Sequence, residues 1–255
     1  MNNDKEIECL RYDERAQSLL ATGAVTVEAT AVLGSMAVAP IYRAPYVYYE
    51  QCIRRYITQD QDVLELGSGA GLHTYALAQT GARVVASDIS PNSLEVLSRR
   101  FNRGRVKTQV ADMEMLPFND NTFDVVTSAG SLSYGDPTLV DAEIRRVLKP
   151  GGLFICVDSL NHNPVYRLNR WLHYKKGERT LSTLLRMPTM ERIEAIAKGF
   201  KETDVRYFGT ISYLTPVLAR IIGQNHTAQV SDSVDQLVNV RKSAFKFVLV
   251  AKGRL

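Results

Sequence analysis

Short apolar runs alternate with segments of helical pattern through most of this 255-residue chain. The clearest example extends from Val63 to Asp88, where an apolar run, three glycines, a helical pattern and a second apolar run follow one another. Apolar runs of strand length separated by helical patterns are typical of βαβ units. The segment therefore predicts a strand, a glycine turn, a helix that starts near His73, and a second strand.

The glycine turn of this unit predicts a ligand site. Gly67, Gly69 and Gly71 let the backbone bend sharply and let a ligand approach without meeting a Cβ. The free N–H groups at the start of the next helix face the same space. Asp88 ends the second strand, where a carboxylate can accept hydrogen bonds from both hydroxyls of a ribose. The pattern predicts a nucleoside pocket.

The spacing of the glycines indicates which nucleoside-containing cofactor the pocket binds. The chain has G-x-G-x-G, preceded by Glu65, where a dinucleotide site has G-x-G-x-x-G. Here the sequence resembles the class I S-adenosylmethionine-dependent methyltransferases. The resemblance implies that S-adenosyl-L-methionine is the cofactor, with its methionine end at the glycine turn and its ribose at Asp88. The cofactor-binding residues expected from it are Glu65, Gly67, Ser68, Gly69, Gly71, Asp88, Ile89, Asp112, Met113 and Ala129.

Later segments extend the resemblance. Asp112 and Met113 follow a strand-like run, where the family places an acid near the adenine amino group and an apolar neighbour against the ring. The stretch from Leu116 to Leu132 resembles the family's loop and fourth strand, and Glu143 to Asp158 resembles its helix, Pro-Gly-Gly turn and fifth strand. The implied fold is α/β: a doubly wound, seven-stranded, mostly parallel sheet with an N-terminal helical lid and an insert after strand five.

The length suits one domain, 1–255, with a lid at 1–60, a cofactor-binding core at 61–158, a substrate-side insert at 159–200 and C-terminal strands and helices at 201–255. Cap and proline patterns predict helix starts at Ser90 and Asp136. Further elements are expected as helices at Ala44–Ile57, with Pro45 in the first turn, Pro216–Ile222 and Val234–Val240, and as strands at Thr203–Tyr213 and Ala244–Ala251, the last one antiparallel.

The composition limits the classes of binding partner and the compartment that we expect for this chain. A net charge of +4 permits an anionic acceptor but does not indicate a nucleic-acid binder. Three scattered cysteines indicate reduced thiols and no metal site. The charged N-terminus is unlike a signal peptide, and the apolar stretch Ala21–Pro40 contains Glu28, so we expect a cytoplasmic protein without an integral membrane segment. That stretch is expected to be a flexible lid or a partly buried segment. The oligomeric state is not predicted.

The catalytic group is sought after strand five, because open α/β sheets bind ligands beyond the carboxyl ends of their strands. A hydroxyl acceptor needs a base during methyl transfer. His162 is the expected base, because it lies just past strand five and histidine titrates near neutral pH, and Asp158 is expected to orient it or to act itself. A purely structural hydrogen bond at His162 is the alternative. Tyr134 and His173 are weaker candidates for the base, and His73 is expected to pack or to contact the cofactor rather than to act as a base.

The insert is rich in cations and aromatic rings. Such a set can recognise a phosphate or carboxylate together with a ring face, or form the solvated basic face of an amphipathic helix. We expect Tyr134, Arg167 and Arg170 to bind the acceptor. The insert's cations are Arg167, Arg170, Lys175, Lys176, Arg179 and Arg186, against one acid, Glu178.

The sequence thus predicts an S-adenosylmethionine-dependent methyltransferase that acts on a small molecule, with O-methylation of a sugar or other hydroxyl as the first interpretation. The acceptor is expected to be anionic or nucleotide-linked. C- or N-methylation of a quinone-like or natural-product scaffold is one alternative. A non-catalytic cofactor-binding protein is the other, and the intact glycine and acid pattern argues against it.

Overall fold

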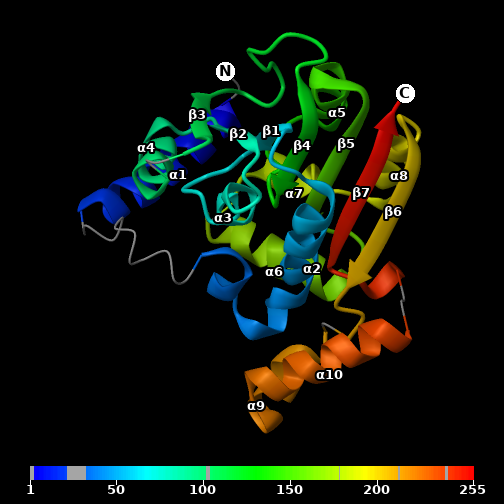
Figure 1. The fold of residues 1–255 in the computed structure, drawn as a ribbon. Coiled ribbons are helices and arrows are strands. Elements are labelled where there is room, and N and C mark those ends of the chain that lie inside the picture. The colour runs from blue at the N-terminus through cyan, green and yellow to red at the C-terminus, as the bar shows by residue number, and fades with distance from the viewer. Residues whose placement is uncertain (1–2, 22–32, 102–103, 178, 212, 239–240) are drawn as a thin grey trace.

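The computed structural model describes all residues except 1–2, 22–32, 102–103, 178, 212 and 239–240. A central sheet lies between layers of helices (Figure 1). Its seven strands have the order β3-β2-β1-β4-β5-β7-β6, and β7 alone is antiparallel to its neighbours. The predicted seven-stranded, mostly parallel sheet is confirmed. The strands are β1 (Asp62–Leu66), β2 (Arg83–Asp88), β3 (Val106–Val110), β4 (Phe123–Ala129), β5 (Leu148–Ser159), β6 (Phe200–Phe208) and β7 (Lys246–Arg254).

The helices cover both faces of the sheet and one of its ends. They are α1 (Asn3–Ala21), α2 (Pro40–Tyr56), α3 (Thr74–Ala78), α4 (Pro91–Arg100), α5 (Pro137–Val147), α6 (Pro164–Lys175), α7 (Leu181–Leu185), α8 (Met190–Ala197), α9 (Thr215–Ile222) and α10 (Gln224–Leu237), with short 3₁₀ helices at Gly34–Ala37 and Arg241–Ser243.

Two apolar cores hold the layers together. On one face, α5 and α8 bury Val140, Ile144 and Ile193 against the sheet. On the other face, α2 buries Tyr49 and Ile53, together with side chains of α3. Both faces of the central strands β1, β4 and β5 are therefore covered, which explains why these strands are mostly buried, whereas the edge strand β3 is mostly exposed.

The helix starts predicted from cap residues are confirmed. Ser90 accepts a hydrogen bond from the N–H of Ser93, and Asp136 accepts from the N–H groups of Thr138 and Leu139. The second helix differs from the expectation: it begins at Pro40 rather than Ala44, so Pro45 lies inside it. A proline at the first helical position costs nothing, and this places the start at Pro40.

The sixth strand ends earlier than expected. It stops at Phe208 because the N–H groups of Gly209 and Thr210 donate to the carboxylate of Asp235 on α10, at 2.6 and 2.8 Å. These two N–H groups are therefore not available to continue the β-ladder. The helix expected at Val234–Val240 is the last part of the longer α10, and residues 239–240 lie outside the described residues.

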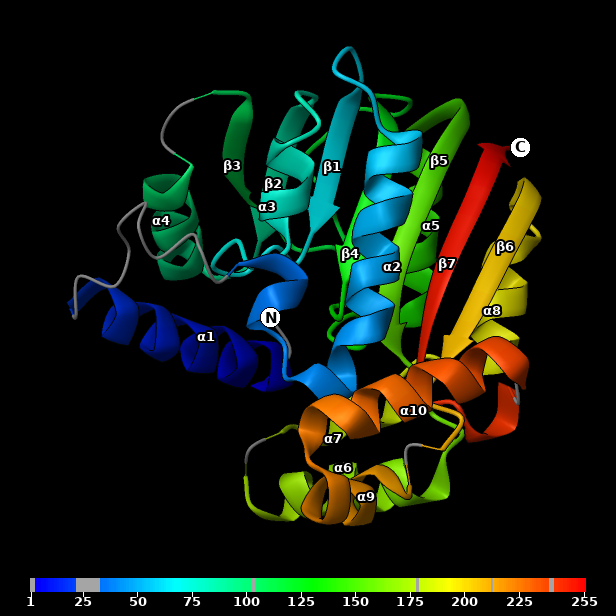
Figure 2. The same ribbon diagram turned by 60° about the horizontal axis from the view of Figure 1, so that its bottom comes forward.

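A layer of helices lies beyond the carboxyl ends of the parallel strands. Figure 2 shows α1, α6, α7, α9 and α10 together at this end of the molecule, opposite the C-terminus. Most of the expected segment Ala21–Pro40 falls on residues 22–32, outside the described part. Ligand sites in such sheets form at this end, so the helical layer determines access to them.

Candidate functional site

A cavity of about 370 Å³ lies at the carboxyl ends of four adjacent strands, β1 to β4. Residues of α1 close its outer side. Nine of the ten predicted cofactor-binding residues line it. The exception is Gly71, whose added Cβ would collide with Phe101 and Leu97, so this glycine lets α4 pack closely.

The glycine turn shapes the floor of the cavity. Gly67 has φ +62°, and an added Cβ would overlap with the side chain of Ser131. Gly69 has φ +52°, and an added Cβ would meet no atom within 4 Å. Both glycines adopt a conformation that other residues rarely take, but only Gly69 faces open space. The turn therefore leaves room for a ligand directly over Gly69.

Asp88 is fixed at the edge of this space. Its Oδ2 accepts the N–H of Gly69 at 2.8 Å, and its Oδ1 accepts the N–H of Ser90 at 2.9 Å. Burial raises the pKa of Asp88 despite these donors. A buried carboxylate is stabilised by additional hydrogen-bond donors, and the two hydroxyls of a ribose would supply them.

Glu65 lies beneath the turn and is almost completely buried. Its Oε2 accepts a hydrogen bond from the hydroxyl of Thr74 at 2.6 Å. Burial raises the pKa of Glu65 to about 7, and the charge of Asp88 adds to the effect. Ser68, between the two acids in the turn, has a buried hydroxyl without a hydrogen-bond partner among the described residues. A polar ligand group would form hydrogen bonds with the hydroxyl of Ser68 and the carboxyl of Glu65.

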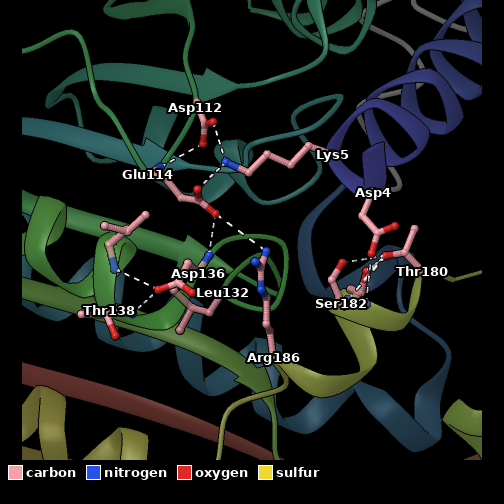
Figure 3. Close-up of polar contacts among 12 residues, drawn as sticks. Asp4, Lys5, Asp112, Glu114, Leu132, Asp136, Thr138, Thr180, Ser182 and Arg186 are labelled. Atoms are coloured by element: carbon pink, nitrogen blue, oxygen red, sulfur yellow. Dashed lines mark hydrogen bonds and ion pairs between the residues drawn. The ribbon is translucent and has the colours of Figure 1, made fainter. Parts of the chain in front are cut away.

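The far wall of the cavity combines one acid with apolar groups. Ile89, Met113 and Ala129 contribute the apolar surface, which suits a flat ring such as adenine. Asp112 bonds to Lys5 of α1, with 2.6 Å between Nζ and Oδ2 (Figure 3). The same lysine lies 2.6 Å from Glu114, so two carboxylates hold the first helix to the end of β3.

Further polar contacts join α1 to the insert, as Figure 3 shows for Asp4. Asp4 accepts the N–H of Ser182 at 3.2 Å. Glu8, which is buried, accepts the hydroxyls of Thr180 and Thr183 at 3.0 and 3.1 Å. The start of α7 is therefore tied to the helix that covers the cavity.

A tyrosine pair lies where the cavity meets the insert. The hydroxyls of Tyr12 and Tyr134 are 2.6 Å apart, and Arg179 donates to Tyr134. Burial raises the pKa of Tyr12, and Tyr134 adds to it. Tyr134 lines the cavity as expected for an acceptor-binding residue. Arg179 is the insert cation that reaches this position.

His73 forms another part of the cavity wall. It stacks on Tyr46 with ring centroids 4.7 Å apart, and its Nδ1 is buried without a hydrogen-bond partner among the described residues. Burial lowers the pKa of His73 to about 4, and the charge of Lys246 adds to the effect. Burial also acts to lower the pKa of Lys246, but Tyr46, Tyr166 and Asp158 raise it overall. At neutral pH, His73 is uncharged and Lys246 is cationic.

The predicted catalytic residues lie outside the cavity lining. His162 accepts the N–H of Met190 through Nε2 at 3.0 Å, which joins it to the start of α8. Asp158 is buried and accepts the N–H groups of Leu132 and Ser159 at 2.9 and 2.6 Å. This geometry does not favour His162 as the base, because its Nε2 accepts a structural hydrogen bond from the backbone of Met190. It favours the structural alternative.

The two predicted arginines of the insert are also outside the lining. Arg167 is exposed on α6. Arg170 lies over the ring of Tyr166 at 5.2 Å and donates to the hydroxyl of Ser159 at 3.3 Å. Glu178, the acid expected among them, lies outside the described residues.

Sequence reasoning missed the residues of α1 that complete the site. Tyr12 of α1 lines the cavity, whereas the tyrosines of α2 do not. The only indication in the sequence was that α1 carries several charges that could pair with the core. The α1 residues in the lining are Lys5, Glu8, Tyr12, Arg15, Ala16 and Leu19.

Comparison with known proteins identifies the core. Residues 64–156 match the model of a methyltransferase domain family. The matched segment begins within β1 and ends within β5, so it contains the glycine turn, Asp88 and Asp112. The predicted resemblance to class I methyltransferases is confirmed for this segment.

Curated relatives match somewhat less than half of the chain. A sterol 4-C-methyltransferase of Caenorhabditis elegans is 38% identical over 125 residues, which are 47% of this chain and 37% of the relative. A demethylmenaquinone methyltransferase of Clavibacter sepedonicus is 42% identical over 116 residues, 44% of this chain and 47% of the relative. The matches therefore span less than half the length of these relatives.

Solved structures resemble most of the fold. The geranyl diphosphate C-methyltransferase of Streptomyces coelicolor A3(2) superposes with a TM-score of 0.57 at 16% identity, covering 82% of this chain and 79% of its own. The phosphoethanolamine N-methyltransferase 2 of Haemonchus contortus superposes with a TM-score of 0.57 at 21% identity, covering 82% and 53%. At these identities the likeness concerns the fold.

Proposed function

We propose that this chain, whose residues 64–156 form a methyltransferase domain, transfers a methyl group from S-adenosylmethionine to a carbon atom of a small apolar molecule. The observation that carries the proposal is the open space over Gly69 beside the buried carboxylate of Asp88. When bound, the cofactor supplies an activated methyl group on a sulfonium. The residues of this chain would bind and orient the cofactor and the acceptor, and would exclude water from the site.

The residues present fit this cofactor. Asp88 would accept the ribose hydroxyls, and Asp112 would accept the adenine amino group beside Met113. The hydroxyl of Ser68 and the carboxyl of Glu65 would face the polar methionine end, since both are buried near the glycine turn. Positioning of this kind is the main contribution an enzyme can make when the methyl group is already activated.

The chemistry of the relatives favours an apolar acceptor. The sterol and demethylmenaquinone methyltransferases act on ring systems of low polarity, and the first of them is named for transfer to carbon. The sugar O-methylation expected from the sequence needs a base, and His162 lies outside the cavity lining. We therefore favour the alternative of a quinone-like or sterol-like scaffold.

The Tyr134 and Arg179 pair would recognise the acceptor. A ring hydroxyl that releases its proton to solvent on binding would leave its negative charge beside the guanidinium of Arg179 and hydrogen-bonded to the Tyr134 and Tyr12 pair. The oxyanion makes the neighbouring ring carbon more nucleophilic, so a bond from this carbon to the methyl group would form as the bond from the methyl group to sulfur breaks. The methylated ring carbon would then lose its proton to water, which restores the ring. Neutral His73 on the same cavity wall would accept a hydrogen bond from the acceptor.

Calorimetric titration tests the cofactor first. S-adenosylhomocysteine should bind the wild type and should bind Asp88→Ala weakly, whereas NAD should bind neither. Binding of NAD alone would contradict the proposal. Retention of S-adenosylhomocysteine binding with no methyl transfer to any acceptor would instead support the non-catalytic alternative.

Methyl transfer tests the acceptor. Labelled S-adenosylmethionine would be supplied with a demethylated quinone, a sterol or a nucleotide-linked sugar, and the methylated atom would be located by NMR. A C-methyl product from one of the first two is expected. An O-methyl sugar as the sole product would overturn the proposed acceptor class and leave the cofactor assignment intact.

A further inference from the structure

The helix α6 presents an apolar stripe to the solvent. Val165, Leu168 and Leu172 are 51%, 57% and 45% exposed, and their i, i+3, i+7 spacing places them on one helix face. Trp171 beside them is 44% exposed, and none of the twelve residues of α6 is buried. A helix of a globular protein normally turns such a stripe toward the core.

The opposite face of α6 makes the contacts with the protein. The hydroxyl of Tyr166 lies 2.8 Å from that of Ser159, and the ring of Tyr166 packs at 5.8 Å from that of Phe245. Arg170, one turn further along, donates to Ser159. The helix is therefore held by its polar and aromatic side, and its apolar side is left outward.

The helix α9 repeats this arrangement. Leu214 just before it, Val217 and Ile221 are 45%, 58% and 73% exposed at the same i, i+3, i+7 spacing. Figure 2 shows α6 and α9 at the same end of the molecule, beyond the carboxyl ends of the parallel strands. Both exposed stripes therefore belong to helices at the same end of the molecule.

The charged side chains on these helices are of one sign. The described helices α6, α7 and α9 contain no aspartate or glutamate, whereas Arg167, Lys175 and Arg220 are exposed on them. The ammonium of Lys175 lies 5.4 Å from the ring centre of Trp171. Tryptophan and leucine flanked by long cationic side chains are typical of a helix that lies in the boundary layer of a membrane.

We propose that the surface formed by α6 and α9, here called the α6–α9 face, docks on an anionic lipid bilayer. The apolar stripes would enter the boundary between headgroups and acyl chains, and Arg167, Lys175 and Arg220 would pair with lipid phosphates. Among the helices that the structure describes, none is both long and apolar enough to cross a membrane.

Docking would present the methyl-transfer site to the bilayer, a consequence that rests on the proposed function. The insert that begins with α6 continues to Arg179, which bonds to Tyr134 in the cavity wall. A quinone-like or sterol-like acceptor resides in the membrane because it is apolar. It would enter beside the α6–α9 face without crossing water.

Vesicle flotation tests the proposal. The full chain should float with vesicles of phosphatidylcholine and phosphatidylglycerol and much less with phosphatidylcholine alone. Leu168→Glu and Ile221→Glu should each lower partitioning onto the anionic vesicles by about tenfold, because each places a charge in the apolar stripe. Arg167→Gln should lower it about fivefold on anionic vesicles only.

Leu255→Glu is the matched control. Leu255 is 70% exposed and lies at the opposite end of the molecule, as Figure 2 shows for the C-terminus. It should float like the wild type. Titration of every variant with S-adenosylhomocysteine reports on folding and on the cofactor site separately from vesicle binding, so failure of docking and failure of the proposed function are distinguishable.

Three results would overturn the proposal. The first is that the wild type does not float with anionic vesicles. The second is that both glutamate variants float to the same extent as Leu255→Glu. Alternatively, sedimentation would show a dimer that Leu168→Glu dissociates, with no vesicle binding by the wild type, and the α6–α9 face would then be a contact between two copies of the chain.

Discussion

The ammonium group of Lys5 lies 2.6 Å from the carboxylate of Asp112, so an ion pair joins the first helix to the acid two residues after the third strand. Both side chains are mostly shielded, with exposures of 12% and 32%. Because α1 forms the outer wall of the cavity, this contact couples closure of the site to the residue expected to bind adenine.

The first prediction concerns this coupling. Lys5→Met should weaken binding of S-adenosylhomocysteine by about fivefold, the effect of an ion pair worth about 1 kcal/mol. Calorimetry measures it. Arg99→Met is the control, because Arg99 and Glu95 form an exposed pair away from the cavity. Equal affinities for all three proteins would show that α1 does not contribute to cofactor retention.

The second prediction separates backbone strain from occupation of the cavity. Gly69→Ala and Gly177→Ala should both cost about 1–2 kcal/mol of stability, because both positions have positive φ, at +52° and +73°. At neither position would a Cβ meet a protein atom within 4 Å. Only Gly69 lines the cavity, so only its variant should lose S-adenosylhomocysteine binding. Loss of binding in both variants would point to strain alone.

The third prediction concerns pH. Burial raises the pKa of Glu65 from 4.5 to about 7, so the unfolded chain releases this proton at lower pH than the folded chain. Stability from the protonated form is therefore complete below pH 4.5, is lost as the pH rises through about 7, and does not return above it. The shift corresponds to roughly 3 kcal/mol.

Glu65→Gln keeps an acceptor for the hydroxyl of Thr74 and cannot ionise. Its free energy of unfolding relative to the wild type should rise by roughly 3 kcal/mol across this pH range, measured by urea denaturation at each pH. A constant difference between the two proteins would mean that Glu65 ionises normally in the folded state.

The fourth prediction concerns the ion pair between α5 and α8. Arg192 and Asp141 are 2.7 Å apart with side chains 7% and 11% exposed, and Arg192 also donates to the carbonyl of Leu132 at 2.9 Å. Arg192→Met alone should cost about 3–5 kcal/mol, because it leaves a buried carboxylate unpaired. The double variant with Asp141→Leu should recover much of this loss. Strict additivity in denaturation experiments would contradict the pairing.

The fifth prediction concerns His162. Because Nε2 accepts the N–H of Met190, His162→Ala should lower stability by about 1 kcal/mol through loss of one hydrogen bond at the start of α8. The rate of methyl transfer should not change. Tyr134→Phe, in the cavity wall, should slow the transfer or raise the KM for the acceptor. A large loss of rate in His162→Ala with unchanged stability would restore the base predicted from the sequence.

Local rules explain why the core of the site was predictable from the sequence. A G-x-G-x-G turn between an apolar run and a helical pattern requires positive φ at Gly67 and Gly69, and an acid at the end of the next strand must lie at the same edge of a parallel sheet. The acids at Glu65 and Asp88 and the glycine turn between them were therefore predicted to form one site, and they lie together around the cavity in the structure. The same is true of Asp112 and Met113.

The remaining contacts of the site follow from long-range packing. The sequence places Lys5 and Tyr12 far from Asp112 and Tyr134, and contacts between such distant segments depend on how a helix packs rather than on any local pattern. In the same way, His162 follows strand five as expected, but its Nε2 accepts a hydrogen bond from the N–H of Met190 at the start of α8. The fold on the cofactor side was predictable from the residues alone, because strand and turn rules act within a few residues. The packing of α1 and the insert decided the acceptor side, because there each group is positioned by a partner distant in the chain.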